Sequence, residues 1–265
     1  MNSFEKMLNT DFVVTIEVVP PKGPAPDLLI QSLSNISSLP FHGFNVATNP
    51  IAKPCMSAMA CAHLIQDHLK KAAILHLSPR DENRLGLQST LWGAKAMGID
   101  TVLVLSGDPS KSADTSRVDD LSVFDLISLS RDSGLFTGAV FDFRPETDGF
   151  DAEVRRLKLK KAAGASFIIT QPVYDEETAR KIQQVAAWLE IPVIMGILPL
   201  VSDRHARFLH DKVNGIRIPS SLIKRIEAAE NPLSEGIGQA KNLLQISRDC
   251  FSGACIMPPF DHYEV

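Results

Sequence analysis

Polar side chains that can bind a ligand or move a proton stand at the ends of several short apolar runs. Glu17 lies near the end of one run, Asp108 follows Leu105-Ser-Gly, and Gln171 follows Ile168-Ile-Thr. A carboxyl group can act as a general acid or base. An amide offers both a donor and an acceptor, which suits the amide-like edge of a pterin or flavin ring. These residues are therefore the first candidates for chemistry.

Glu17 belongs to an alternating segment that has one wholly apolar face. Within Phe12–Val19, one face carries Phe12, Val14, Ile16 and Val18, and the other carries Val13, Thr15 and Glu17. Successive strand residues point to opposite sides, so packing of the apolar face against helices would point Glu17 into the interior. Burial there raises the pKa of a carboxyl group and suits a proton donor near neutral pH. A structural glutamate paired with an internal Arg or Lys is an equal alternative.

Other polar residues also have simpler structural explanations. Asp108 could cap a turn, although the glycine before it permits close approach of the backbone to a ligand. His76 could be a core histidine with a backbone partner. Asp175 is expected to cap the helix that follows it. The basic stretch 155–161 could be a solvated helix face, or it could reach a phosphate group.

The elements that must position these residues alternate between short apolar runs and longer amphipathic ones. The strand-like runs are Phe12–Val19, Phe44–Ala47, Ala72–Leu77, Thr101–Leu105, Gly138–Phe143, Ser166–Thr170, Pro192–Ile197 and Gly253–Met257. The helix-like runs are Asp27–Ser38, Met56–Leu69, Asp81–Met97, Asp119–Arg131, Asp151–Ala163, Glu176–Leu189 and Asp203–Lys212, with two more helices expected within Ser220–Arg248. This alternation is typical of a parallel sheet, because parallel neighbours need crossover connections.

Eight strands in 265 residues predict one α/β domain over residues 1–265, a single (β/α)8 TIM barrel. An open, doubly wound sheet is the alternative, but prolines rather than a glycine-rich dinucleotide fingerprint follow the first strand. Active sites of such barrels form at the C-terminal ends of the strands, where the candidate residues stand. The chain stops at Val265, so we expect the final barrel helix to be largely missing.

Composition excludes several functional classes. Apolar residues make up 45% and charged residues 22% of the chain, which is typical of a globular protein. The net charge of −4 gives no indication of a nucleic-acid partner, which usually needs a basic face. No apolar run approaches the roughly 20 residues that cross a bilayer, and the N-terminus lacks a signal-peptide core. We therefore expect a cytoplasmic protein with no membrane partner. The cysteines are expected to be reduced thiols rather than a metal or redox site: Cys55, Cys61, Cys250 and Cys255.

Several strings, in order along the chain, resemble the methylenetetrahydrofolate reductase family. They are Ile16-Glu-Val-Val-Pro-Pro-Lys22, His76-Leu77, Leu105-Ser-Gly-Asp108, Ala162-Ala-Gly-Ala-Ser-Phe-Ile-Ile-Thr-Gln171, Gly196-Ile-Leu-Pro199 and Ile216-Arg-Ile-Pro219. The resemblance implies a (β/α)8 barrel that carries FAD and takes hydride from NADH or NADPH. It implies reduction of 5,10-methylenetetrahydrofolate to 5-methyltetrahydrofolate in one-carbon metabolism, or the reverse oxidation.

The resemblance also implies roles for individual residues. Glu17 falls on the proton donor that helps to open the imidazolidine ring of the folate. Asp108 falls on the carboxylate near the pterin and the pyrimidine edge of the flavin, and Gln171 falls on the folate-binding glutamine. Positions at or near flavin contacts are Thr48, His76, Asp108, Arg144, Arg156 and Lys160, and Leu209 stands at a substrate-contact position.

The chain departs from the family at several of these places. Ser106 and Arg144 stand where many members have Arg and His, and the loop 49–53 is unlike the usual glycine-containing one. Leu209 stands where an aromatic residue often stacks on substrate or nicotinamide. These differences leave NADH, NADPH and an electron-transfer partner protein all open as the electron donor. We expect a homo-oligomer that takes a folate substrate.

Two other functions fit the same residues. A folate-binding methyltransferase barrel would move a methyl group to a corrinoid or a thiol without a flavin, so the colour of the pure protein distinguishes it. A catalytically silent barrel subunit of a larger electron-transfer complex is the other alternative. The joint presence of Glu17, Asp108 and Gln171 argues against a silent subunit.

Overall fold

The computed structural model describes residues 3–108, 117–143, 149–213, 216–259 and 262–263. Eight parallel strands close into a barrel in chain order, from β1 to β8 and back to β1. They are β1 Val13–Val18, β2 Gly43–Val46, β3 Ala72–Leu77, β4 Thr101–Val104, β5 Phe136–Phe141, β6 Phe167–Pro172, β7 Val193–Ile197 and β8 Gly253–Ile256. The predicted (β/α)8 class is confirmed, and the open doubly wound sheet is wrong.

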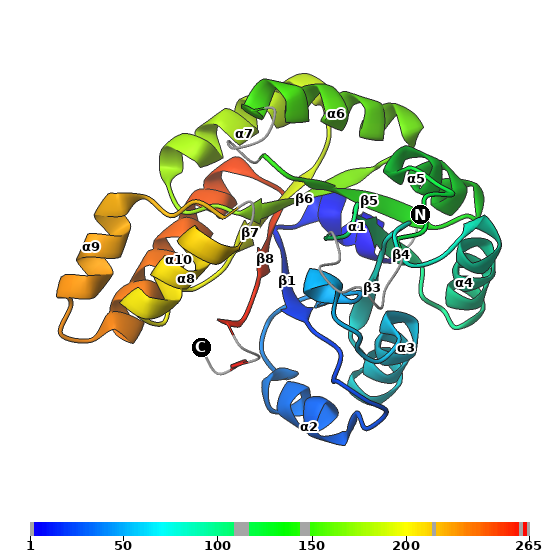
Figure 1. The fold of residues 1–265 in the computed structure, drawn as a ribbon, viewed down its shortest axis with the longest axis horizontal. Helices are drawn as coiled ribbons and strands as arrows, with labels where there is room; N and C mark the ends of the chain where they lie inside the picture. The colour runs from blue at the N-terminus through cyan, green and yellow to red at the C-terminus, as the bar shows by residue number, and fades with distance from the viewer. Residues whose placement is uncertain (1–2, 109–116, 144–148, 214–215, 260–261, 264–265) are drawn as a thin grey trace.

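Helices surround the barrel (Figure 1). Those described are α1 Ser3–Thr10, α2 Asp27–Ile36, α3 Ala58–Leu69, α4 Arg84–Ala96, α5 Val123–Asp132, α6 Gly149–Ala163, α7 Glu176–Leu189, α8 Asp203–Lys212, α9 Ser220–Ala228 and α10 Pro232–Cys250, with a short 3-10 helix η1 at Pro50–Ala52. Each expected strand and helix is present within a few residues of its expected bounds. Asp175 caps α7 as predicted, because its carboxylate accepts a 2.7 Å hydrogen bond from the Thr178 amide.

The faces of β1 lie as its alternation predicts. Val18 packs in the large cluster between the strands and the helices, whereas Val13 packs in a smaller cluster inside the barrel. Thr15 is fully buried on the inner side, and Glu17 lies beyond it toward the C-terminal end of the strand. One face of β1 therefore anchors the strand against helices, and the other carries polar groups toward the barrel mouth.

Helix α1 closes the opposite end of the barrel, and the sequence pattern does not predict it. Phe4 and Leu8 lie one helical turn apart and are both buried in the inner cluster. The Phe4 ring lies 5.8 Å from the Phe167 ring and 6.5 Å from the Phe136 ring, measured between centroids. Since residues 136 and 167 begin β5 and β6, α1 covers the N-terminal ends of the strands.

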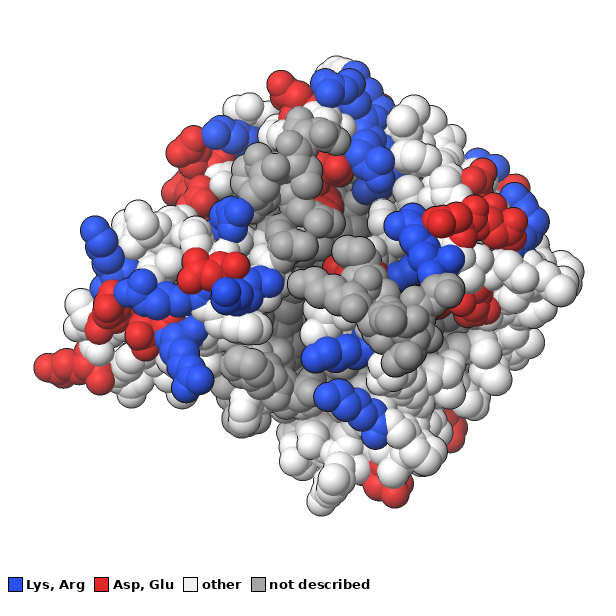
Figure 2. All heavy atoms as spheres, in the orientation of Figure 1, with Lys and Arg blue, Asp and Glu red and all other residues white. Residues whose placement is uncertain are grey.

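The surface carries charges of both signs. Basic and acidic side chains are interspersed over the face drawn in Figure 2. Among the described residues, no helix combines the length and the apolarity needed to cross a membrane. All four cysteines are free thiols, as predicted.

Candidate functional site

A cavity of about 310 Å³ opens at the C-terminal ends of the strands. This volume lies at the low end of the range of roughly 300–1,000 Å³ typical of small-molecule sites. Its polar lining includes six of the residues singled out from the sequence, namely Glu17, Thr48, His76, Asp108, Lys160 and Gln171. The apolar side chains of the wall include Leu103, Leu105, Ile169, Leu198 and Met257.

Glu17 enters the cavity from β1. It is half-buried and stands opposite Asn45 in the register between β1 and β2. Cys255 of β8 also lines the cavity and lies close enough to Glu17 for its thiol to respond to the carboxylate. Burial raises the pKa of the Cys255 thiol, and the charge of Glu17 raises it further. Cys255 is therefore a neutral neighbour of Glu17 in the cavity lining.

A buried amide beside Glu17 organises the floor of the cavity. Asn45 is fully buried; its side-chain nitrogen donates to Thr15 Oγ1 at 2.7 Å and to Cys255 Sγ at 3.3 Å. Its side-chain oxygen lies 3.4 Å from Nε2 of His76. Buried amides need such partners, since an unsatisfied one costs about 1–3 kcal/mol. Sequence analysis missed Asn45, although an asparagine inside the apolar run 44–47 was a usable signal.

His76 is a neutral cavity residue. Complete burial lowers its pKa to about 3. Because the Asn45 side-chain oxygen can only accept, the neutral imidazole carries its proton on Nε2 and donates it there. Its partner is thus a side chain, whereas the simpler interpretation of His76 expected a backbone partner. His76 offers the cavity no positive charge at neutral pH.

Gln171 is presented by an irregularity in β6. The pairing of β6 with β7 shifts between Ile169 and Pro172. Thr170 Oγ1 accepts from the Gly196 amide at 2.9 Å and donates to the Gln171 carbonyl oxygen at 2.7 Å. A Cβ at position 196 would collide with the Thr170 carbonyl oxygen, so the approach requires glycine there. The half-buried amide of Gln171 is thereby held at the cavity wall.

Asp108 stands on the turn after β4. Its Oδ2 accepts a 2.9 Å hydrogen bond from the Ile51 amide in the loop after β2. The preceding Gly107 has a φ of +74°, and a Cβ there would collide with Ser78 Oγ. The glycine thus permits close approach of two segments of this chain, where the sequence analysis expected approach to a ligand. The Asp108 carboxylate remains part of the cavity lining.

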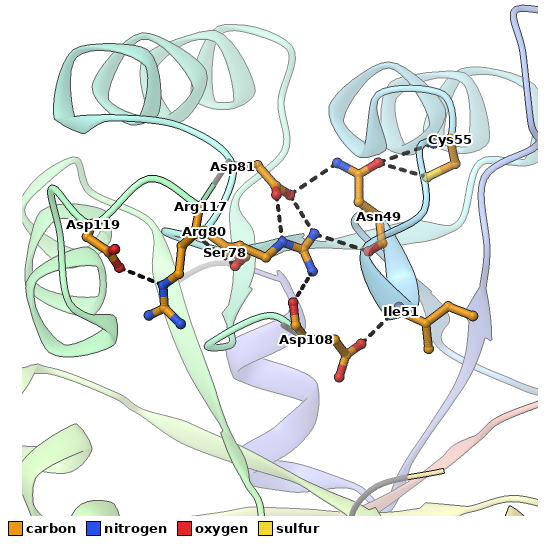
Figure 3. A network of polar contacts seen from close by, with 9 residues as sticks. All are labelled: Asn49, Ile51, Cys55, Ser78, Arg80, Asp81, Asp108, Arg117 and Asp119. Atoms are coloured by element: carbon orange, nitrogen blue, oxygen red, sulfur yellow. Dashed lines mark hydrogen bonds and ion pairs between the residues drawn. The ribbon is translucent and has the colours of Figure 1, made fainter. Parts of the chain in front are cut away.

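Arg80 is a site residue that sequence analysis missed. Its side chain is 5% exposed, and Nε and Nη2 grip the Asp81 carboxylate at 2.6 and 2.7 Å (Figure 3). Nη2 also donates to the Asn49 carbonyl oxygen at 3.1 Å, and Nη1 donates to the Asp108 carbonyl oxygen at 3.0 Å. Hydrogen bonding to Asp81 raises the pKa of Arg80. Burial opposes ionisation of Asp81, but hydrogen bonds from Arg80 and Asn49 outweigh it and lower its pKa.

Three of the residues implied by the resemblance lie elsewhere or are not described. Arg156 on α6 is 41% exposed, pairs with Glu153 at 3.4 Å and does not line the cavity. Leu209 on α8 is buried in an apolar cluster with α9 and likewise does not line the cavity. Arg144 lies outside the described residues. Lys160, on the same helix as Arg156, is buried and donates to the Val140 carbonyl oxygen at 2.7 Å while lining the cavity.

The described part of the chain contains no set of side chains placed to bind a metal ion. No group of three or more His, Cys, Asp and Glu side chains there is placed to hold an ion. The polar lining instead consists of amide, hydroxyl, imidazole, carboxylate and cationic groups from strands, loops and helix α6. Such a set can bind an organic ligand through directional hydrogen bonds and can donate or accept protons.

Solved structures confirm the architecture at low sequence identity. The crystal structure of 2,3-dimethylmalate lyase, a PEP mutase/isocitrate lyase superfamily member, matches with a TM-score of 0.61 and 14% identity. The alignment covers 99% of this chain and 81% of that one. A structure of oxaloacetate acetylhydrolase matches with a TM-score of 0.57 and 11% identity, over 96% and 78% of the two chains. At these identities the likeness shows the fold alone.

Three relatives found by sequence similarity are named as methylenetetrahydrofolate reductases. The probable methylenetetrahydrofolate reductase (NADPH) of Caenorhabditis elegans is 25% identical over 64% of this chain and 27% of its own length. The 5,10-methylenetetrahydrofolate reductase of Salmonella typhimurium is 27% identical, over 63% and 57%. That of Pectobacterium carotovorum is 24% identical, over 82% and 74%. The matched part thus spans about a quarter of the nematode protein and just over half of the Salmonella protein.

The family assignment rests on nearly the whole chain. A sequence model of the family described as methylenetetrahydrofolate reductase matches residues 3–253, which takes in α1, the strands β1 to β7 and every residue of the cavity lining up to Ile216. The expected resemblance is confirmed, and this chain belongs to the methylenetetrahydrofolate reductase family.

Proposed function

We propose that the protein reduces 5,10-methylenetetrahydrofolate to 5-methyltetrahydrofolate, or catalyses the reverse oxidation, with a bound flavin. One observation carries the proposal: Glu17, Asp108 and Gln171 come from β1, the turn after β4 and β6, yet they line one cavity. The chain belongs to a family named for this reaction. A proton donor, a carboxylate and an amide in one partly apolar cavity suit a flat heteroaromatic substrate.

The lining also fits a flavin. Apolar wall residues offer contact to ring faces, and the polar groups offer donors and acceptors to ring edges. Thr48, His76, Asp108 and Lys160 would hold FAD, with the buried ammonium of Lys160 as a cation in the lining. A bound flavin would supply the hydride that the folate methylene accepts. Burial keeps the His76 imidazole neutral, so His76 adds no positive charge to this wall.

Glu17 protonates the folate. Hydride can reach the bridging methylene only after the five-membered ring opens to an electrophilic iminium, and opening needs a proton on the departing nitrogen. Glu17 faces the cavity from the C-terminal end of β1, beside Asn45 and the neutral Cys255. General acid catalysis of this kind typically contributes about 10²–10⁴-fold to the rate.

Gln171 and Asp108 orient the substrate. Gln171 offers an amide to the pterin edge from the bulged end of β6. Asp108 offers the carboxylate that Ile51 holds through a single hydrogen bond to Oδ2. Two anchors, one on β6 and one on the turn after β4, fix a planar ligand in one orientation, which keeps the reacting methylene in line with Glu17.

The remaining parts of the proposal concern the whole protein. The electron donor is NADH, NADPH or a partner protein; the name of the nematode relative includes NADPH. We further propose a cytoplasmic homo-oligomer whose single barrel, residues 1–265, is the catalytic domain. Analytical ultracentrifugation of the purified chain measures the oligomeric state directly.

Glu17→Gln tests the proposal, because it keeps the shape of the side chain and removes its proton. We expect folate reduction to fall by at least about 10²-fold, while reduction of the flavin by the nicotinamide stays within about threefold of wild type. Stopped-flow absorbance of the flavin follows the two half-reactions separately. Equal losses in both would make Glu17 structural, and a loss in neither would assign the proton to another group.

A further inference from the structure

We propose that Arg80 is a positioning residue that fixes both the Asp108 turn and the loop 49–53 at the mouth of the cavity. The loop part of this inference stands on geometry alone, and the part about ligand binding rests on the proposed function. Arg80 lines the cavity with 5% of its side chain exposed, and nothing in the proposed chemistry uses it directly. Its contacts instead point to the backbone of two neighbouring loops (Figure 3).

Three segments far apart in sequence meet at the Arg80 guanidinium. It grips the Asp81 carboxylate on its own segment, the Asn49 carbonyl oxygen after β2 and the Asp108 carbonyl oxygen after β4. Asn49 returns to the same group, because its side-chain nitrogen donates to Asp81 Oδ2 at 3.1 Å. The C-terminal ends of β2, β3 and β4 are thus joined through one side chain.

Only an arginine can make this set of contacts. The planar guanidinium presents donors along several fixed directions, whereas a lysine ammonium is a point charge on a flexible stem. Here two parallel bonds hold Asp81 while the remaining edge reaches two carbonyl oxygens. A lysine would keep the charge but lose the bidentate pair or the bridge to the loops.

Arg80 also determines where Asp108 points. Gly107 turns with a φ of +74° and approaches Arg80 and Ser78 so closely that a Cβ would collide. Ser78 Oγ accepts a 3.1 Å hydrogen bond from the Arg80 amide, which fixes the inner side of this contact. With its carbonyl oxygen held by Nη1, Asp108 directs its carboxylate toward the Ile51 amide.

The loop after β2 needs this support because its backbone is strained. Asn49, Ile51 and Ala52 have φ values of 39°, 49° and 55°, in the left-handed region. That region is strongly disfavoured for a β-branched residue such as Ile51. Arg80 holds the first residue of the loop and Asp108 holds the third. Loss of Arg80 removes the contact with the Asn49 carbonyl oxygen directly. It also loosens the contact between Asp108 and the Ile51 amide, because the Asp108 turn is no longer held.

Arg80 acts by placement and does not neutralise the Asp108 carboxylate. Its guanidinium bonds the main-chain oxygen of Asp108, and its charge is matched by Asp81 at hydrogen-bond distance. A variant that keeps a positive charge should therefore fail nearly as completely as one that removes it. Arg80→Lys therefore distinguishes the two roles, because it would preserve an electrostatic attraction but not the positioning of the two loops.

Hydrogen–deuterium exchange of the ligand-free protein tests the loop. The informative amides are those of Ile51, Ala52 and Lys53, which are bonded to Asp108, Asn49 and Pro50. We expect both Arg80→Ala and Arg80→Lys to speed exchange of residues 49–53 by about tenfold or more. Arg80→Lys serves alone should the alanine variant not fold. Unchanged exchange in a folded Arg80 variant would overturn the inference.

Arg131→Ala is the matched control. Arg131 also pairs with the aspartate that follows it, at 2.8 Å, and donates to a main-chain oxygen, that of Ala163. It borders a surface pocket at the N-terminal ends of the strands, with Glu5 and Phe136. We expect exchange of residues 49–53 in this variant to match wild type. Acceleration there as well would show a general loss of stability and would overturn the assignment to Arg80.

A double-mutant cycle with Asp108→Asn tests the step from loop to ligand, with 5-methyltetrahydrofolate as the probe. We expect Arg80→Ala and Asp108→Asn each to weaken folate binding by about tenfold relative to wild type. The double variant should also lose only about tenfold, because both substitutions act through the Asp108 carboxylate. Additive losses of about 100-fold would overturn action through Asp108. Wild-type protein that binds no folate, with the loop still released by Arg80→Ala, would contradict the proposed function and leave the positioning role supported.

Discussion

Gln171 is the residue whose loss should weaken folate binding with the least effect on the flavin. Gln171→Ala leaves a polar ligand edge without its partner, which costs about 1–3 kcal/mol. We expect folate affinity to fall accordingly, while the flavin half-reaction with nicotinamide changes little. Fluorescence titration with 5-methyltetrahydrofolate measures the loss. Gln245→Ala, on the exposed side of α10 where the amide bonds only Asp249 among the contacts described, is the control. Equal affinities of the two variants would remove Gln171 from the site.

Asp108→Asn separates the charge of Asp108 from its contact with the loop. The asparagine keeps an oxygen that can accept from the Ile51 amide, so the loop should stay in place. A carboxylate beside the proposed flavin disfavours the anionic reduced form, because like charges repel. We therefore expect the midpoint potential of the flavin to rise in the variant, and spectroelectrochemistry measures it. A potential that is unchanged or lower, with normal folate affinity, would leave Asp108 as a turn residue.

His76 should make the folded state sensitive to acid. Burial lowers its folded pKa to about 3, below the value of about 6.5 in an unfolded chain. Between these two pKa values only the unfolded state binds the proton. The contribution of neutral His76 to the free energy of unfolding is therefore complete above pH 6.5 and is lost as the pH falls toward 3. The loss is about 1.4 kcal/mol per pH unit, or roughly 2 kcal/mol between pH 6.5 and pH 5.

Urea unfolding at pH 7.5 and pH 5.0 checks this prediction. His76→Asn removes the titrating group, so the free energy of unfolding of the variant should fall less between the two pH values than that of wild type. The difference between the two drops should approach roughly 2 kcal/mol. Identical drops would show that His76 is protonated in the folded state or remains accessible to water.

Candidate residues could be predicted from the sequence where their position relative to a strand marks them. Residues whose role depends on contacts with distant segments were missed. Glu17 and Gln171 lie near the C-terminal ends of apolar strands, and Asp108 lies on the turn after one. The C-terminal ends of barrel strands form the active-site face. Arg80 is recognisable only through Asn49 and Asp108, which lie about 30 residues away on either side and have no pattern linking them to it. Spatial contact of this kind leaves no periodicity in the sequence.

Two residues transferred by resemblance, on α6 and α8, lie away from the cavity lining, and their roles stay predictions. Arg156 and Leu209 match family positions in order along the chain, yet neither lines the cavity. Arg156 stacks on Phe124, with 5.6 Å between its guanidinium carbon and the ring centroid, and so covers an apolar helix surface. A helix places its residues around a full circle, so a small change in its rotation moves a side chain from a cavity to a flank.

Among the elements, strands were predictable because each is a short run of β-branched and apolar residues between turn residues. Helix α1 was not, because only Phe4, Met7 and Leu8 are apolar in a largely polar segment. Its formation depends on the open end of the barrel, where Phe4 meets Phe167. Tertiary packing rather than local propensity therefore decides whether residues 3–10 are helical.

Phe4→Ala measures the contribution of α1. Phe4 is 2% exposed inside the barrel, and removal of a buried phenylalanine typically costs about 3–5 kcal/mol. We expect the free energy of unfolding in urea to fall by that amount without a change in folate affinity, because α1 covers the end away from the cavity. Phe208→Ala is the matched control, since Phe208 is 52% exposed on α8. A loss no larger than that of the control would show that α1 does not close the barrel.

At the scale of the whole molecule, the two ends of the barrel have different tasks. The N-terminal end is filled by aromatic side chains and α1, whereas the C-terminal end holds the cavity and the polar loops. The barrel closes through eight strand pairs, so the cavity residues on β1, β3 and β6 are fixed relative to one another by backbone hydrogen bonds. Local loop changes, such as those around Arg80, can therefore tune the site without altering the fold.

The most direct test of the proposed reaction is the visible spectrum of purified protein, loaded with FAD and reduced photochemically without oxygen, on mixing with 5,10-methylenetetrahydrofolate. Photoreduction makes the result independent of the electron donor. We predict that flavin absorbance returns within a single turnover and that 5-methyltetrahydrofolate forms in equal amount. A colourless protein that takes up neither FAD nor FMN, or a reduced flavin that the folate fails to reoxidise, would contradict the proposed function.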